Sequence, residues 1–343
     1  MRVNSEATEF GGGEGEVSMS NVTQASSSGQ GVFCVVCGSD QTRLARDNLQ
    51  DFEYSVVPEE PLTAWECSSC RSQFLEPRPS EGVLSTFYPE DYHCYNEDHG
   101  GFAKQLVAAR ARRRSKQYRN FLGGNSGRLF DVGAGDCRHF DELRGSLDLE
   151  CAGVELNPQM AEAGRARGYD IHDGTLEELD ITEMVGTFDI VSMNHVLEHV
   201  INPIEVVRRC YLLLRPGGYI VGQLPCFSSW EARAFGRAWG GYHFPRHLQM
   251  FSAEGLRQLL SSCGLSEPSA RSALHVQTAL SLQNATIRAG WHPKMRYGKS
   301  PAYGAFLLAA VPFEIAAFAC NRGGIMNFSA RRPIASGPEA TPR

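Results

Sequence analysis

The chain has 343 residues, of which 42% are hydrophobic and 21% are charged, and its formal net charge is −6. This balance predicts a folded globular protein and excludes a fibrous chain or one that is disordered throughout. The acidic net charge argues against a protein that coats nucleic acid by charge alone. The chain holds eleven cysteines and begins without the apolar run of a signal peptide. We therefore expect a reducing, cytoplasmic compartment, in which paired cysteines indicate metal before disulfide.

Both ends of the chain are predicted to be loose. Residues 1–30 are rich in glycine, serine and glutamate and nearly free of large apolar side chains. Such a segment buries too little surface to offset the entropy of ordering, so we expect a disordered tail. Residues 332–343 are expected to form a second flexible tail.

Two CxxC pairs dominate residues 31–80. Cys34 and Cys37 form the first pair, and Cys67 and Cys70 form the second. Each pair makes a tight knuckle that aims two thiolates at one point, and four thiolates in a tetrahedron suit a structural zinc ion. A segment this short has little core, so metal binding would supply much of its folding free energy. The sequence therefore predicts a small zinc ribbon.

Residues 81–126 are predicted to connect the ribbon to the rest of the chain. They begin with an aromatic stretch that includes Tyr88, Tyr92 and Tyr95 and continue as a basic helix around Phe102–Phe121. Aromatic side chains in such a connector either pack between domains or reach into a site.

Apolar strands alternate with amphipathic helices from residue 127 to residue 331. Helices are expected from Ile204 to Leu214 and, capped by Ser252, up to Cys263, with a turn at Arg215–Gly218. This alternation predicts an α/β fold with a mostly parallel, doubly wound sheet and helices on both faces. The expected strands are Leu129–Val132, Ala152–Leu156, Gly168–His172, Phe188–Met193 and Tyr219–Leu224.

A glycine-rich loop follows the first of these strands. Asp131, Gly133 and Gly135 form an Asp-x-Gly-x-Gly motif, whose glycines let the backbone approach a ligand closely. Arg138 occupies the place of the third glycine that a dinucleotide-binding fingerprint needs, so a pyrophosphate cradle is disfavoured. Glu155 ends the second strand, where a carboxylate can accept hydrogen bonds from both ribose hydroxyls of an adenosine.

The ordered set of motifs resembles the class I S-adenosylmethionine (SAM) dependent methyltransferases over about residues 127–331. The resemblance implies a Rossmann-like sheet of seven strands whose last strand is antiparallel. Strands six and seven would be Ala273–Ser281 and Ile325–Arg331, and the apolar segment Gly304–Cys320 between them would be a packed helix.

The resemblance also implies where SAM binds. The glycine loop would hold the methionine end and the acid the ribose, while the segments after strands three and four would border adenine and the sulfonium. The positions concerned are Asp131, Gly133, Gly135, Glu155, Leu156, Gly174, Thr175, Asn194 and His195.

Methyl transfer to a hydroxyl or a carbon acid also needs a base, and a histidine of near-neutral pKa is suited to this task. His247 lies in a segment that resembles the His-Leu-x-x-Phe-Ser stretch of zinc-ribbon sugar C-methyltransferases. Phe244, Pro245 and Arg246 depart from that group's Tyr-His-Glu string, so both O- and C-methylation stay open. The resemblance further implies that a connector tyrosine, Tyr92 or alternatively Tyr95, reaches into the site.

Two further histidines follow the fourth predicted strand. His195 and His199 are four residues apart, with Glu198 before the second, and we expect them to share one face of a short helix. His199 is a further catalytic candidate. A metal held by this trio is the alternative, which the sequence favours less.

The predicted acceptor is a small molecule or a sugar, including one linked to a nucleotide or a lipid. An RNA methyltransferase with a zinc module is the alternative, suggested by the basic run from Arg110 to Arg119. A basic run is most often a solvated face, so nucleic acid is not favoured. Residues 304–320 are too short to span a membrane, and packing on the protein is favoured over contact with a lipid surface. The sequence does not predict the oligomeric state.

Overall fold

The computed structural model describes residues 31–47, 49–88 and 101–334, and only the backbone of residues 81, 85, 101–108 and 110. The predicted N-terminal tail, Tyr92, Tyr95 and most of the predicted C-terminal tail lie outside the described residues. Residues 32–334 belong to a single compact unit.

A seven-stranded sheet forms the centre of this unit, in the strand order β10-β11-β8-β7-β4-β5-β6. The strands from β4 to β8 run parallel, and β11 is antiparallel to both of its neighbours. This confirms the predicted Rossmann-like sheet with an antiparallel last strand. The strands are β4 (Ser126–Val132), β5 (Asp148–Glu155), β6 (Asp170–Asp173), β7 (Phe188–Asn194), β8 (Leu214–Pro225), β10 (Ser266–Ala273) and β11 (Ile325–Arg331).

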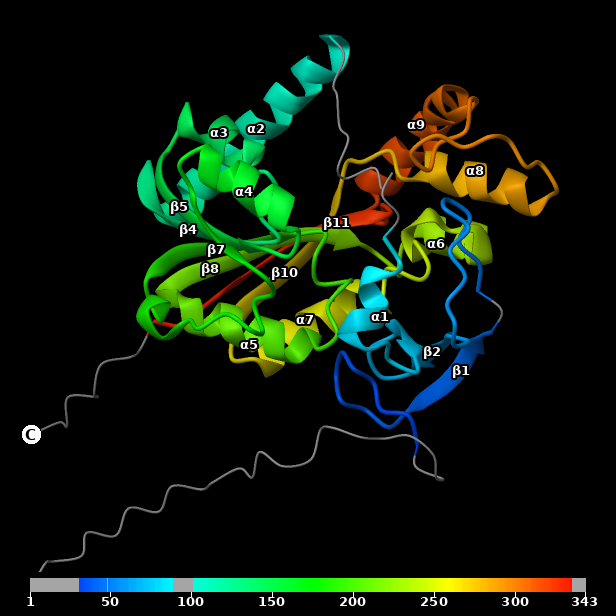
Figure 1. Ribbon diagram of the computed structural model, residues 1–343, viewed down its shortest axis with the longest axis horizontal. Helices are drawn as coiled ribbons and strands as arrows, with labels where there is room; N and C mark the ends of the chain where they lie inside the picture. Colours follow the sequence, from blue (N-terminus) through cyan, green and yellow to red (C-terminus); the bar gives the residue numbers. More distant parts are fainter. Residues whose placement is uncertain (1–30, 48, 89–100, 335–343) are drawn as a thin grey trace, which may run out of the picture. The chain divides into compact units, whose positions relative to one another are not determined.

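Helices cover both faces of the sheet (Figure 1). One face packs on α2 (Gly101–Leu122), α3 (Arg138–Arg144) and α4 (Pro158–Ala166), through a core that includes Tyr118 and Phe140. The other face packs on α5 (Pro203–Leu213) and α7 (Ala253–Ser262). The remaining helical segments are α1 (Glu81–Ser85), η2 (Thr182–Met184), α6 (Trp230–Phe235), η3 (Gly236–Ala238), η4 (Gly240–Tyr242), α8 (Thr278–Arg288) and α9 (Tyr303–Ala319).

Side-chain caps fix where several of these helices begin. The side chain of Asn157 accepts two backbone N–H groups at the start of α4, and Asn202 does the same for one at the start of α5; a proline follows each cap. Ser252 caps α7 by accepting the N–H of Gly255, as predicted. These caps satisfy amides that would otherwise be unpaired, which explains why the helices start at these residues.

Three local predictions are wrong. The sixth strand is Ser266–Ala273 rather than Ala273–Ser281, because Glu314 of α9 accepts hydrogen bonds from the N–H and hydroxyl of Thr278 and thereby starts helix α8 there. Residues 195–199 form a turn rather than a short helix. The segment Arg215–Gly218 lies inside β8, where it shifts the register against β7, although Gly217 has the positive φ of 84° expected for a turn.

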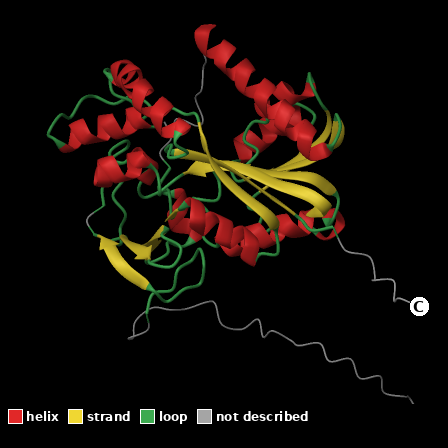
Figure 2. Ribbon diagram, turned by 180° about the vertical axis from the view of Figure 1, so that it is seen from behind, coloured by secondary structure: helices red, strands yellow, loops and turns green. Residues whose placement is uncertain are grey.

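A second sheet has four strands, in the order β1-β2-β3-β9. Three of them come from the cysteine-rich segment, namely β1 (Thr42–Arg46), β2 (Thr63–Cys67) and β3 (Gln73–Glu76). The fourth, β9 (Gln249–Met250), comes from the loop that precedes α7. Figure 2 shows the strands of the protein in yellow. The cysteines and Phe74 share one apolar core with α7. The cysteine-rich segment therefore pairs with β9 and packs against α7. The predicted domain boundaries stay predictions.

Helix α9 lies between β10 and β11 in the sequence, as predicted, and packs on α8. Part of its apolar surface is exposed, with Leu308 at 78% and Ile315 at 56% of their full accessibility. No helix among the described residues is both long enough and apolar enough to cross the bilayer.

Candidate functional site

The glycine loop leaves the carboxyl end of β4 in a conformation that requires glycine. Gly133 and Gly135 have φ values of 75° and 56°, a region that side chains disfavour. A Cβ at Gly133 would lie 2.6 Å from Cγ2 of Val196. The loop therefore touches the segment that follows β7, and the two predicted SAM-binding segments meet at this edge of the sheet.

Glu155 is fixed beside this loop by two backbone amides. Gly135 N–H donates to Oε2 at 2.8 Å and Asn157 N–H donates to Oε1 at 2.8 Å. Burial raises the pKa of Glu155 above its usual range. Each oxygen keeps a second lone pair, so the carboxylate can still accept hydrogen bonds from a diol.

The remaining predicted adenine-side residues lie next to Glu155. Gly174 donates its N–H to the carbonyl of Glu155 at 3.0 Å and has a φ of 108°. The hydroxyl of Thr175 donates to Glu178 at 3.0 Å. Leu156 is 67% exposed although it is apolar, which is the exposure expected of a side chain that packs on a flat ligand.

Both carboxylate oxygens of Asp131 contact other side chains of the protein. Asp131 is buried, its Oδ1 accepts a hydrogen bond from Ser192, and its Oδ2 lies 2.8 Å from Nε2 of His139. The carboxylate thus ties β4 to β7 and α3 beneath the glycine loop. Its predicted contact with the methionine end of SAM stays a prediction.

Asn194 ends β7, and His195 opens the segment that follows. His195 has a φ of 56°, and its N–H donates to the carbonyl of Gln223 on β8 at 2.8 Å. Its ring lies 3.3 Å from Glu198 and 3.3 Å from the side chain of Gln223. Because residues 195–199 form a turn, His195 and His199 belong to two different sets of contacts.

His199 and His247 form the centre of a buried cluster. Their rings lie 4.6 Å apart, edge to face. Nδ1 of His247 lies 2.8 Å from the carbonyl of Gly241, and Nδ1 of His199 lies 3.0 Å from the carbonyl of Arg246. A carbonyl only accepts hydrogen bonds, so both rings carry their proton on Nδ1 and present Nε2 as an acceptor.

Tyr88 reaches this cluster from the connector. Its hydroxyl lies 3.0 Å from Nδ1 of His199. The sequence prediction placed a connector tyrosine in the site but chose Tyr92, which is outside the described residues. Tyr88 belongs to the same aromatic stretch, so this stretch was the sequence feature that could have identified it.

The N-terminal segment holds the loop that carries His247. Arg246 makes a two-pronged ion pair with Asp51, with both distances at 3.0 Å and both side chains fully buried. The ring of His243 lies 2.8 Å from Glu53. Asp51 and Glu53 were not predicted as site residues, and no local pattern distinguishes them from surface acids.

Burial keeps the cluster histidines neutral. It lowers the pKa of His199 to about 4 and that of His243 to about 3, and it also lowers the pKa of His247 well below its usual value. The neighbouring histidine charges act in the same direction on His247. All three rings are therefore neutral at pH 7, with one ring nitrogen able to accept a proton.

Glu198 completes this arrangement. It is 1% exposed, and its Oε2 has no hydrogen-bond partner among the described residues. One carboxylate oxygen of Glu198 and one ring nitrogen each of His199 and His247 lie within 4.8 Å of one another. Such a set of acceptors calls for a donor, which is either the hydroxyl of a bound molecule or a divalent cation.

The four predicted cysteine ligands come together. Sγ of Cys34 lies 3.7 Å from Sγ of Cys70, and Sγ of Cys37 lies 3.6 Å from Sγ of Cys67. Four thiolates at Zn–S distances of about 2.3 Å would be roughly 3.8 Å apart in a tetrahedron. The cluster geometry therefore fits a four-coordinate metal ion.

The central part of the chain is similar to known methyltransferases. Residues 106–266 match the family model of a methyltransferase domain. The matched segment contains strands β4 to β8 of the seven-stranded sheet.

Individual relatives are more distant. A ubiquinone biosynthesis O-methyltransferase of Bordetella avium is 36% identical over 107 residues, which cover 23% of this chain and 44% of that protein. One of Xanthomonas oryzae is 32% identical over 97 residues, covering 26% of this chain and 40% of that protein. The chain thus spans less than half the length of these relatives. A solved SAM-dependent methyltransferase from Thermotoga maritima is 18% identical with a TM-score of 0.43, covering 67% of this chain and 94% of that one.

Proposed function

We propose that the protein transfers a methyl group from SAM to a hydroxyl or an acidic carbon of a small-molecule or sugar acceptor. The observation that carries this proposal is the pairing of two sites at one sheet edge. A glycine loop with a fixed carboxylate, Glu155, lies there, and the segment after β7 leads from Val196 directly to the acceptor-rich cluster of Glu198 and His199. The named relatives, which act in ubiquinone biosynthesis, agree with a small acceptor.

The residues of the first site would hold SAM. Glu155 would accept the ribose hydroxyls, Leu156 and Thr175 would border the adenine, and Asn194 and His195 would lie near the sulfonium. Bound SAM supplies an activated methyl group, so the protein mainly has to align the acceptor and exclude water.

The residues of the second site would orient and deprotonate the acceptor. Nε2 of His247 would accept the proton of an acceptor hydroxyl, because Nδ1 is already committed to the carbonyl of Gly241. His199 and Glu198 would share the resulting charge. A neutral histidine whose pKa is lowered is a weak base, so proton transfer would accompany methyl transfer rather than precede it.

A structural zinc ion belongs to the proposal. Cys34, Cys37, Cys67 and Cys70 would hold it, and all four coordination positions would be filled by the protein, which leaves no place for a catalytic water. The ion would stabilise the knuckles that position β3 against β9.

The test is transfer of a labelled methyl group from SAM into a cell extract separated into small-molecule and RNA fractions. We expect the label in the small-molecule fraction, insensitive to ribonuclease. Label that enters RNA and is released by ribonuclease would contradict the proposal and support the alternative acceptor.

A further inference from the structure

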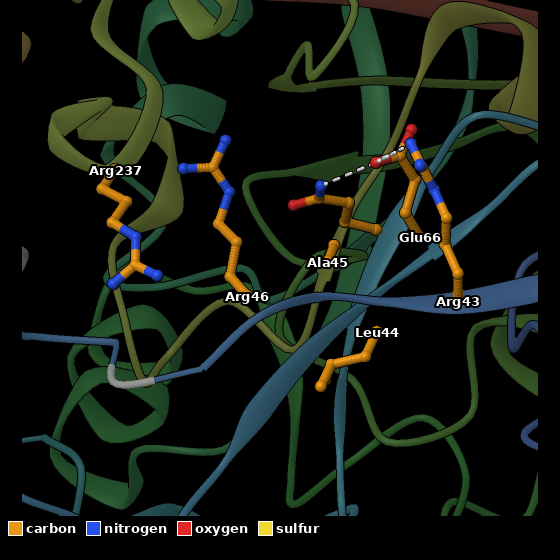
Figure 3. A pocket seen from close by; sticks show the side chains of 7 residues that line it. Arg43, Leu44, Ala45, Arg46, Glu66 and Arg237 are labelled. Carbon is orange, nitrogen blue, oxygen red and sulfur yellow. Dashed lines mark hydrogen bonds and ion pairs between the residues drawn. The ribbon is translucent and has the colours of Figure 1, made fainter.

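We propose that a pocket on the ribbon sheet binds a phosphate ester or a diphosphate group. The pocket has a volume of about 280 Å³ and lies between β1 and η3 (Figure 3). None of its residues has a part in the proposed methyl transfer, so the inference stands on its own observations. The pocket is lined by Arg43, Leu44, Ala45, Arg46, Glu66, Gln73 and Arg237.

A β-bulge places two of the arginines on the same face. Arg43 pairs with Glu66 and Leu44 with Trp65, but the next pair along β1 is Arg46 with Ala64. The extra residue in β1 turns Arg46 toward the side of Arg43, where a regular strand would send it to the opposite side. Figure 3 shows both arginines rising from β1 on one side and Leu44 on the other. A bulge that redirects a side chain is a device often found next to binding sites.

The charge of the pocket is unbalanced. Three arginines and one glutamate line it, in a chain whose net charge is −6. Arg43 lies 3.5 Å from Glu66, and Arg237 lies 3.3 Å from Asp47, in pairs that are largely exposed and therefore weak. Within the described ranges, Arg46 makes no ion pair; its guanidinium lies over the ring of Tyr242, 5.2 Å from the centroid.

This arrangement suits a phosphate better than a single carboxylate. Guanidinium groups match phosphate oxygens in two-pronged hydrogen bonds, and several of them balance an anion of charge about −2. Arg46 and Arg237 repel each other when the pocket holds only water, and an anion between them removes this repulsion.

A second, adjoining pocket suggests what the phosphate is attached to. It has a volume of about 100 Å³ and shares Arg237 with the first. Phe52, Tyr242 and Phe244 give it an aromatic lining, and Arg288 adds a further positive charge. The ligand class is therefore a phosphate ester with a flat or apolar substituent.

The first experiment titrates the full-length protein with pyrophosphate by calorimetry at physiological ionic strength. We expect saturable binding that Arg46→Gln weakens by about tenfold or more, because it removes one charge-assisted pair. Arg257→Gln is the matched control, since Arg257 is an exposed arginine of α7 that pairs with Glu254. Pyrophosphate that does not bind the wild-type protein, or that binds Arg46→Gln equally well, would overturn the proposal.

The second experiment separates two sources of the phosphate. If it belongs to the methyl acceptor, pyrophosphate inhibits labelled methyl transfer competitively, and the labelled product loses phosphate on treatment with phosphatase. If it belongs to a separate effector, pyrophosphate binds without competing, and the product carries no phosphate. SAM binding is measured on the same samples, so a failure of the proposed methyl transfer is recognised independently.

Discussion

The glycine loop and the histidine cluster lie at the same sheet edge but are built in different ways. The loop and its acid come from 25 consecutive residues, Asp131 to Glu155, and the acid is held by hydrogen bonds from the backbone amides of Gly135 and Asn157 to its carboxylate. The cluster needs Tyr88, His199 and His247, whose loop is held in turn by Asp51 and Glu53 of the N-terminal segment. We therefore expect the glycine loop to tolerate substitutions in the N-terminal segment, whereas the histidine cluster should depend on that segment.

The largest expected effect tests that dependence at the cysteines. Cys67→Ser should lose a bound metal of about one zinc per chain and most of the folding free energy that it supplies, roughly 10 kcal/mol for a structural zinc site. Metal analysis and thermal unfolding measure both. Cys320→Ser is the control, because Cys320 is exposed and outside the cluster; a variant of Cys67 that keeps its metal would refute the assignment.

The next effect tests the ion pair between the N-terminal segment and the loop. Asp51→Ala leaves the fully buried Arg246 without its carboxylate, so we expect a loss of about 3–5 kcal/mol in the free energy of unfolding. Urea denaturation measures it. Glu254→Ala breaks an exposed pair with Arg257 and should change stability by less than about 1 kcal/mol. Equal losses in the two variants would show that the loop does not depend on Asp51.

The substitution His247→Ala distinguishes loss of methyl transfer from loss of SAM binding. We expect labelled methyl transfer to fall by about 10²–10⁴-fold, the usual contribution of a general base, while SAM affinity stays unchanged. His292→Ala is the matched control, since this histidine is exposed. Full activity of the His247 variant would remove it as the base.

The substitution Glu155→Ala is expected to weaken SAM binding. It removes the carboxylate beside the glycine loop, so SAM affinity should fall by about 10- to 100-fold, in line with the loss of hydrogen bonds to a charged group. Calorimetry measures the affinity. Glu150→Ala, an exposed acid on the same strand, should bind SAM normally. Unchanged affinity in the Glu155 variant would sink the ribose assignment.

The smallest effect for each step of the measurement is a pH dependence of stability. The pKa of His243 is lowered to about 3 by burial, so the folded protein resists a proton that the unfolded chain accepts near pH 6.5. The contribution of His243 to the free energy of unfolding should therefore be constant above about pH 7. Below it, the free energy should fall by up to about 1.4 kcal/mol per pH unit for this histidine. Denaturation at a series of pH values measures the slope, and His243→Gln should reduce it; an unchanged slope would contradict the assignment.

The sequence predicted the parts of the molecule that depend on local patterns. Strand periodicity, glycine positions and cysteine spacing predicted β4, the loop at Gly133 and the four-cysteine cluster, because each is determined by residues close together in the chain. Strand β11 was predicted only from the resemblance to SAM-dependent methyltransferases. The pairing of Asp51 with Arg246 and the strand β9 could not be read in this way, since 195 residues separate the ion pair. The sixth strand was misplaced for the same reason, because the cap on α8 comes from Glu314.

The pairing of β3 with β9 limits which fragments of this protein can fold. A fragment that begins after the ribbon, for example at residue 101, would leave the two residues of β9 without a neighbouring strand and Arg246 without Asp51. Such a fragment would expose the apolar surface that Phe74 and the cysteines now cover. Expression of the chain from residue 101 alone should therefore give aggregated protein, and co-expression with residues 31–88 is expected to restore a folded protein.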